Sequence, residues 1–165
     1  MEPDLVDHIV AQWHKQRPDI DVSGMAVIGR ISRLERMVRP LLARVFASHG
    51  LEAWEFDVLA TLRRNGPPYQ LTAGDLMGAM MITSGAVTNR IDRLERRALI
   101  TRERHPTDGR IVLVALTESG VNLVDEAVAD HAANELNLIA PLEPDEEQTL
   151  TDLLRKLHHY WAHYT

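Results

Sequence analysis

The sequence predicts a mainly α-helical chain with one small β-hairpin. Apolar residues recur at helical spacing through most of its 165 residues. Only residues 100–116 combine runs of β-branched residues with a central cluster of turn formers, which is typical of a hairpin. We therefore expect helices on both sides of a single hairpin.

Two helices are expected in the N-terminal region. Leu5, Ile9 and Trp13 recur every four residues and predict a helix over residues 4–17. A longer helical stripe follows, and it consists of Val27, Ile28, Ile31, Leu34, Val38, Leu41, Leu42 and Val45. Pro40 lies inside this stripe and is expected to bend the helix, because proline lacks the backbone N–H.

Short elements are expected in the middle of the chain. They are helices over residues 53–64, 73–80 and about 84–97, and strands over residues 100–104 and 110–116. Thr72 can cap the second helix and Thr83 or Ser84 the third, since a hydroxyl accepts free backbone N–H groups. The buried stripe of the third helix is expected to contain Val87, Ile91, Leu94 and Ala98.

Two further helices are expected at the C-terminal end, one from Thr117 to Pro141 and one that opens at Pro144. The stripe of the last helix consists of Leu150, Leu153, Leu154, Leu157, Trp161 and Tyr164. It is too long for a solitary exposed helix, so we expect a second copy of the chain to cover it. The predicted regions of one integrated domain are residues 1–50, 51–116 and 117–165, the first and last providing dimerisation helices.

Charge is unevenly distributed along the chain, whose net charge is −6. Residues 83–110, the basic segment, carry seven basic and four acidic side chains, whereas residues 111–165 carry two and ten. A basic segment between acidic flanks is typical of a protein that reads DNA with one part of its surface. The absence of cysteine excludes disulfides and thiolate chemistry. No targeting or membrane-spanning stretch is apparent, so we expect a cytoplasmic protein.

The order of the middle elements predicts a winged helix-turn-helix. Residues at the start of its second helix can reach base edges, and the wing tip places Arg110 near the minor groove. The expected DNA contacts on the second helix are Ser84, Gly85, Thr88, Asn89 and Arg93. Charge alone is equally compatible with a solvated basic helix packed on a hairpin, and the ordered set of elements favours DNA binding.

Three segments also resemble a known family. They are TSGAVTNRIDRLERRALI over residues 83–100, HPTDGR over residues 105–110 and LTESG over residues 116–120. Together they resemble the MarR family of bacterial transcription regulators. The resemblance implies a homodimer on a palindromic operator, with Asp108 orienting Arg110 at the wing tip. His105 stands where the family often has Asp, which alters how the tip is braced.

The N-terminal helix narrows the resemblance to the urate-responsive, PecS-type subgroup. Its marker residues fall here on Trp13, Asp57, Arg64 and Arg90. Asp57 and Arg64 are two helical turns apart, about 10 Å along one helix face. A planar purine anion could stack on Trp13 and accept hydrogen bonds from Arg64 or Arg90. The alternative is a structural tryptophan with ordinary ion pairs and a phosphate-binding Arg90.

The remaining alternatives concern other ligands and functions. An aromatic acid or a polycarboxylate could replace urate, and the chain could be a helical dimerisation module without DNA binding. His159 and His163, with His158 or His131, have a spacing that could bind metal, but a favourable helix-dipole interaction explains them as well. No nucleophile elbow or phosphate loop is present, so no enzyme, cofactor or metal is expected.

Overall fold

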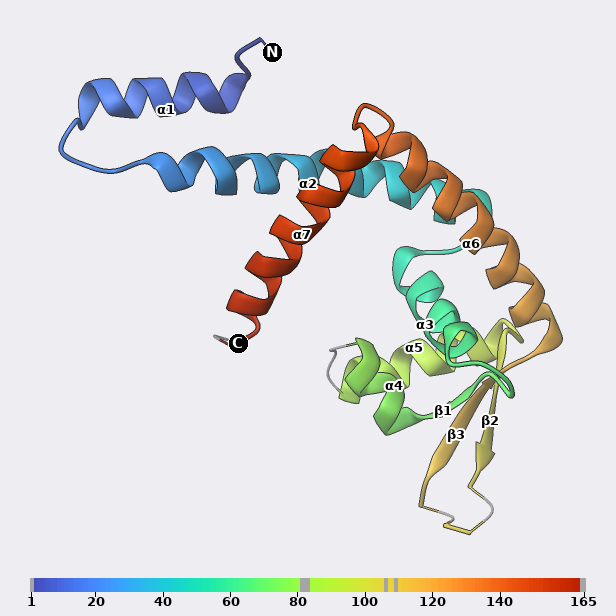
Figure 1. Ribbon diagram of the computed structural model, residues 1–165. Coiled ribbons are helices and arrows are strands. Elements are labelled where there is room, and N and C mark those ends of the chain that lie inside the picture. Colours follow the sequence, from blue (N-terminus) through green and yellow to red (C-terminus); the bar gives the residue numbers. More distant parts are fainter. Residues whose placement is uncertain (1, 81–83, 106, 109, 164–165) are drawn as a thin grey trace. The chain divides into compact units, whose positions relative to one another are not determined.

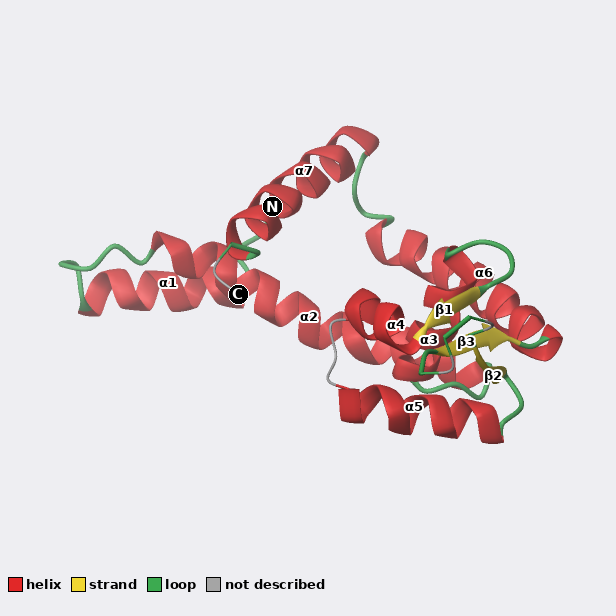
Figure 2. Ribbon diagram, turned by 90° about the horizontal axis from the view of Figure 1, so that it is seen from below, coloured by secondary structure: helices red, strands yellow, loops and turns green. Residues whose placement is uncertain are grey.

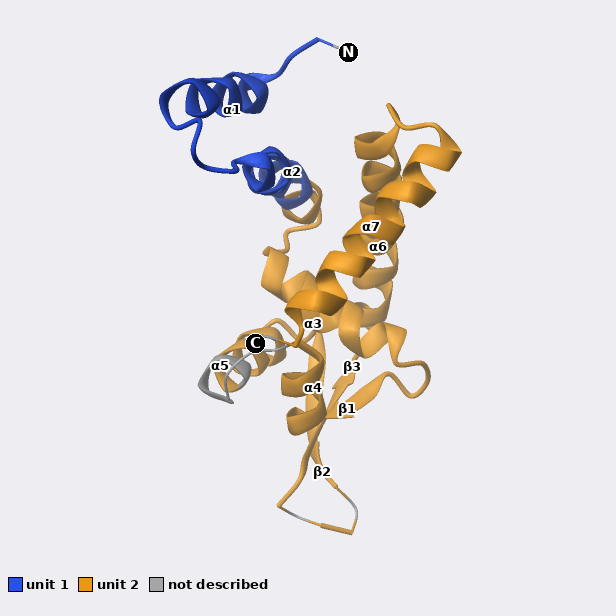
Figure 3. Ribbon diagram, turned by 60° about the vertical axis from the view of Figure 1, so that its left-hand side comes forward, with its two compact units in different colours: residues 1–44 blue, residues 45–165 orange. Residues whose placement is uncertain are grey.

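The computed structural model describes residues 2–80, 84–105, 107–108 and 110–163, without the side chains of residues 84–87. The chain forms two compact units, residues 1–44 and 45–165, as Figure 3 shows. The predicted fold class is confirmed: the protein is mainly helical with a small antiparallel sheet (Figure 1). The division into three functional regions remains a prediction.

The structure contains the following elements in chain order. They are α1 (Leu5–Gln16), α2 (Ser23–Ser48), α3 (Ala53–Arg64), β1 (Gln70–Thr72), α4 (Ala73–Met80), α5 (Ser84–Arg96), β2 (Ile100–Arg104), β3 (Val112–Leu116), α6 (Glu118–Ile139) and α7 (Pro144–Trp161). Helix α2 continues through Pro40 to its end. Among the described residues, no helix is long and apolar enough to cross a membrane.

Within residues 1–44, α1 is capped and tied to the start of α2. The Asp4 carboxylate accepts the backbone N–H groups of Val6 at 2.8 Å and Asp7 at 3.0 Å, so Asp4, the first residue of the predicted helix, is the N-cap of α1. Arg30 on α2 pairs with Asp4 at 3.0 Å and with Asp7 at 2.7 Å. The hydrogen bond from Arg30 lowers the pKa of Asp7 below its ordinary value. Val6 is buried against Gly29 of α2.

Within residues 45–165, the core lies where α3 meets the other elements. Helix α3 contacts α4, α5, α6 and two of the strands, an arrangement that Figure 2 shows from below. The largest fully buried side chains among the described residues are Leu59, Leu62, Leu76, Leu94, Ile100, Val58, Val114 and Val124. They come from α3, α4, α5, α6 and both strands of the hairpin, so burial of this apolar set holds the helix-turn-helix against the sheet.

The sheet has three strands in the order β1-β3-β2, all antiparallel. The hairpin pairs Ile100 with Leu116 and Arg104 with Val112. The predicted hairpin is confirmed, although β3 begins at Val112 rather than Arg110. Strand β1 pairs Leu71 with Val114 and was not predicted, because three residues are too few to show an alternating pattern.

One prediction about the second helix of the pair was wrong. Ala98 was expected on its buried stripe, but α5 ends at Arg96 and Ala98 is exposed with φ of 54°. A residue in this left-handed conformation ends a helix, and here it turns the chain toward β2. Ile91 and Leu94 are buried as predicted, whereas the Val87 side chain lies outside the described set.

Candidate nucleic-acid interface

Helices α4 and α5 form the helix-turn-helix pair, and local sequence determines where α4 begins. The Thr72 hydroxyl accepts the backbone N–H of Asp75 at 3.0 Å and donates to the Asp75 carboxylate at 2.7 Å. The predicted cap of α4 is therefore confirmed. Thr83, the other predicted cap, lies outside the described residues, and Ser84 is the first residue of α5.

Helix α5 presents a polar surface opposite its buried residues. Thr88, Asn89 and Arg93 are exposed, as expected for a helix whose outer side meets a partner. Ser84 and Gly85 occupy the first turn of this helix, where backbone N–H groups have no helical partner and can bind a phosphate. The roles of these five residues in DNA binding remain a prediction.

Three arginines of the basic segment are neutralised within the protein. Arg93 pairs with Glu52, and Arg97 pairs with the buried Glu55 at 2.7 Å. Arg102 on β2 pairs with two carboxylates of α5, Asp92 at 2.6 Å and Glu95. These pairs attach α5 to the start of α3 on one side and to the wing on the other.

The hydrogen bonds and ion pairs around α5 shift the pKa values of two of the groups that form them. The indole N–H of Trp54 donates to Glu52 at 2.8 Å, and this bond together with Arg93 holds the pKa of Glu52 below its usual range. Glu95 and Asp92 raise the pKa of Arg102 above its ordinary value. Both shifts favour the charged forms of Glu52 and Arg102, so the attractions that these two groups make persist at neutral pH.

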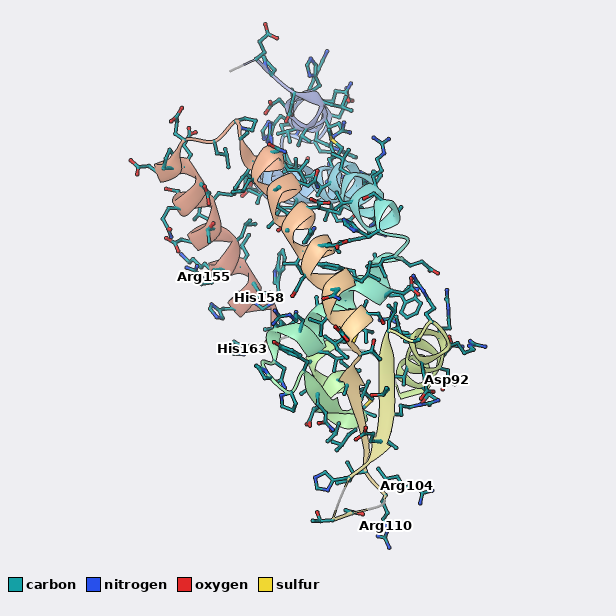
Figure 4. All side chains as sticks on the ribbon, turned by 90° about the vertical axis from the view of Figure 1, so that its right-hand side faces the viewer. Asp92, Arg104, Arg110, Arg155, His158 and His163 are labelled. Atoms are coloured by element: carbon teal, nitrogen blue, oxygen red, sulfur yellow. The ribbon has the colours of Figure 1, made fainter. Side chains whose placement is uncertain are left out.

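A second set of arginines remains available to a partner. Among the described residues, Arg96, Arg104 and Arg110 are exposed and have no ion pair. Figure 4 shows Arg104 and Arg110 near the far end of the hairpin, beyond the helices of this unit. The exposed arginines of the basic segment that have no ion pair therefore lie on the wing and at the end of α5.

The wing tip is braced by short polar contacts. The Asp108 carboxylate accepts the backbone N–H of Arg110 at 3.0 Å, which fixes the backbone from which the Arg110 side chain extends. His105 Nδ1 lies 3.0 Å from the Thr107 hydroxyl and accepts the Thr107 backbone N–H at 3.3 Å. The histidine thus braces the turn from its N-terminal side.

The four residues expected to bind a ligand are divided between the two units. Trp13 is on α1 in the first unit, and its side chain is exposed. Asp57 and Arg64 are exposed on α3, and among the described residues neither has an ion pair. Arg90 on α5 lies with its guanidinium 5.6 Å from the ring of Trp54. The convergence of all four on one ligand remains a prediction.

Trp54 is the residue of this region that sequence reasoning missed. Its ring lies beneath Arg90 and, at 4.6 Å, beneath Arg93, a distance typical of a cation–π contact. It sits one helical turn before Asp57 but about 15 Å along α3 from Arg64, at 1.5 Å per residue. Arg90 is therefore associated with the Asp57 end of α3 rather than with the Arg64 end.

The histidines offer no metal site in the part of the chain that the structure describes, which contains no cluster of three potential ligands. His158 and His159 have ring centroids 6.2 Å apart on α7. His131 instead packs among Phe46 and Phe56, with ring centroids 5.0 Å from each.

This architecture defines a winged helix-turn-helix protein, with α5 as its recognition helix and the β2–β3 hairpin as its wing. Residues 49–111 match the MarR family. The chain is 39% identical to the HTH-type transcriptional regulator PecS of Dickeya dadantii over 92% of each protein. It is 31% identical to MhqR of Bacillus subtilis, covering 77% of this chain and 86% of that regulator.

Solved structures agree with these relationships. A mutant MarR of E. coli, complexed with operator DNA, superposes with a TM-score of 0.69 at 25% identity, over 94% of this chain and 99% of that one. The chain belongs to the MarR family and is a DNA-binding transcriptional regulator rather than an enzyme.

Proposed function

We propose that the protein is a repressor that binds a palindromic operator as a homodimer and releases it when a small anion binds. The anion is urate or a related purine. The observation that carries the DNA-binding part is the division of the basic segment: Arg93, Arg97 and Arg102 hold α5 in place, while Arg96, Arg104 and Arg110 have no ion pair among the described residues. The complex of the related MarR with operator DNA supports the same use of the fold.

The dimer is supported by the apolar surface of the terminal helices. No residue of α7 is buried in the single chain, even though four of them are large and apolar. The exposed fractions of Leu150, Leu153, Leu154 and Trp161 are 42, 55, 45 and 44%. Leu5, Ile9 and Met25 expose further apolar surface in the first unit. A soluble monomer rarely leaves so much apolar surface in contact with water.

We expect sedimentation at micromolar concentration to show a dimer without folded monomer. The interface should bury more than about 2,000 Å² in total, the range of obligate dimers. Leu153→Asp together with Leu154→Asp should disrupt the dimer, because charges would then be buried in an apolar interface. Lys156→Ala, on the same helix, is the control that leaves the dimer intact. A folded wild-type monomer would contradict this part of the proposal.

The DNA contact is tested by Arg110→Ala. Removing one phosphate contact reduces the slope of log K against log salt concentration by about 0.9, and the substitution removes two from a dimer if each wing makes one. We therefore expect clearly weaker binding with a slope shallower by about 1.8, and an unchanged dimer. Mobility shift over a salt series measures both quantities. Arg17→Ala is the matched control, because Arg17 is an exposed arginine already paired with Asp19. Binding of Arg110→Ala at parental affinity would show that the wing does not contact DNA.

The ligand part rests on the set of Trp13, Asp57, Arg64 and Arg90 that this chain shares with the urate-responsive subgroup. Arg90 supports it further, because α5 carries both this residue and the proposed base contacts. An anion that attracts Arg90 must compete with the Trp54 ring for it. Ligand binding and DNA binding would then be coupled through the position of one helix.

A further inference from the structure

The start of α3 carries a group of three side chains that faces the recognition helix, and we name Glu52, Trp54 and Glu55 the cradle. Their partners on α5 and just after it are Arg90, Arg93 and Arg97. These arginines are spaced i, i+3 and i+7, which places them along one side of a helix. The contacts therefore follow α5 over two turns rather than holding it at one point.

Internal hydrogen bonds make the cradle a preorganised unit. The Trp54 indole N–H donates to Glu52 Oε2 at 2.8 Å, and the Glu52 backbone N–H donates to Glu55 Oε2 at 2.9 Å. Glu55 Oε2 also accepts from Arg97 at 2.7 Å, and its residue is only 3% exposed. The carboxylates and the ring are thus held in place partly by bonds within the cradle itself.

The cradle acts on a different side of α5 from its other attachments. Ile91 and Leu94 anchor the helix in the apolar core, and Arg102 of the wing pairs with Asp92 and Glu95. Apolar contacts hold the helix down but tolerate rotation and sliding, because they are not directional. Charged hydrogen bonds and a ring face do restrict both, even where they add little to stability at an exposed site.

We propose that the cradle is a positioning device that sets the rotation and register of the recognition helix, and so determines how well the protein distinguishes its operator from other DNA. The inference rests on the proposed function, since it requires α5 to read bases. Trp54 has the central place, because its ring contacts both Arg93 and Arg90. An anion that withdraws Arg90 would loosen the same device.

The test compares the affinity for an operator with that for unrelated DNA of equal length. The parent chain first selects an operator from a randomised DNA pool. Trp54→Phe keeps a ring face, Trp54→Leu removes it, and Glu52→Gln removes a charge without changing shape. Asp125→Asn is the matched control, because it breaks an exposed pair of α3 and α6, formed with Arg63 at 2.7 Å, that does not involve α5.

We expect the ratio of operator to unrelated-DNA affinity to fall about tenfold in Trp54→Leu combined with Glu52→Gln. Trp54→Phe should lose less, and the control should keep the parental ratio. The salt dependence of binding to unrelated DNA should not become shallower, because no phosphate contact is removed. The melting temperature identifies variants that merely unfold.

The outcomes separate the inference from the function. A parent chain that selects an operator, with cradle variants that are folded and keep its ratio, contradicts the inference alone. A fall in ratio matched by Asp125→Asn also contradicts it, since general loosening then explains the effect. A parent that selects no sequence contradicts the proposed function and the inference together.

Discussion

Saturating urate is expected to weaken the affinity of the protein for operator DNA by between about tenfold and several hundredfold. Two like charges about 4 Å apart repel by about 4 kcal/mol at an effective dielectric near 20, which sets the upper value. Asp57 is exposed on α3, so water screens the repulsion and lowers the effect toward the smaller value. We expect the ligand's charge to displace the Asp57 carboxylate and the movement to reach α5 through Arg90.

Asp57→Asn removes one of the two repelling charges. We expect it to bind operator DNA as the parent does and to respond to urate far less. Asp152→Asn, an exposed carboxylate of α7 paired with Arg155, is the control that keeps the full response. Urate binding is measured by calorimetry rather than by the fluorescence of Trp13, because Trp54 and Trp161 also fluoresce.

Two results distinguish the ligand from the switch. If wild-type protein neither binds urate nor releases DNA with it, the four residues are not a urate site, and the DNA-binding function stands unaffected. If an aromatic acid or a polycarboxylate releases DNA and Asp57→Asn abolishes that release, the switch is correct and urate is the wrong ligand.

Gly120→Ala is expected to destabilise the protein by about 3 kcal/mol or more. A Cβ atom at this buried position would lie 2.0 Å from the backbone oxygen of Leu99. That oxygen is held in place by the Thr117 backbone N–H at 3.1 Å, and the Thr117 hydroxyl caps Gly120 at 3.0 Å. The start of α6 therefore cannot move away from the turn before β2 without breaking its own cap.

Urea denaturation measures this loss, and Gly78→Ala is the matched control. Gly78 is also a helical glycine, but a Cβ there meets no atom within 4 Å. Alanine favours a helix over glycine by up to about 1 kcal/mol, so the control should be neutral or stabilising. Equal midpoints for Gly120→Ala and the parent would show that α6 does not approach Leu99 so closely.

Sequence predicted best those elements whose apolar residues all face one core. Helix α3 has the predicted bounds, because one side contributes Leu59 and Leu62 to the core and turn formers follow its end. Strand β1 was missed because it consists of only three residues, whose pairing with β3 is a tertiary contact. Ala98 was misplaced because continuing the helical period does not show where the backbone turns.

The candidate site was predictable as a set of residues but not as a set of contacts. The basic segment and the wing were evident from the order of arginines and turn formers. Two of the neutralised arginines are paired with carboxylates some 40 positions away, such as Glu52 for Arg93, and periodicity does not report such pairs. The spacing of Arg90, Arg93 and Arg97 on one side of α5 was the available signal that they share a set of partners. The identity of these partners becomes clear only once α3 is known to lie beside α5.

The recognition helix and wing of two chains are proposed to read one palindromic DNA site, and this is the central claim. Hydroxyl-radical footprinting on the selected operator tests it most directly. We predict two protected half-sites related by twofold symmetry, with centres about 10 base pairs or a multiple of that apart. With Arg110→Ala, the protection of the minor groove that the wing is expected to contact should be lost. Uniform protection that ignores sequence, or a single protected half-site, would contradict it.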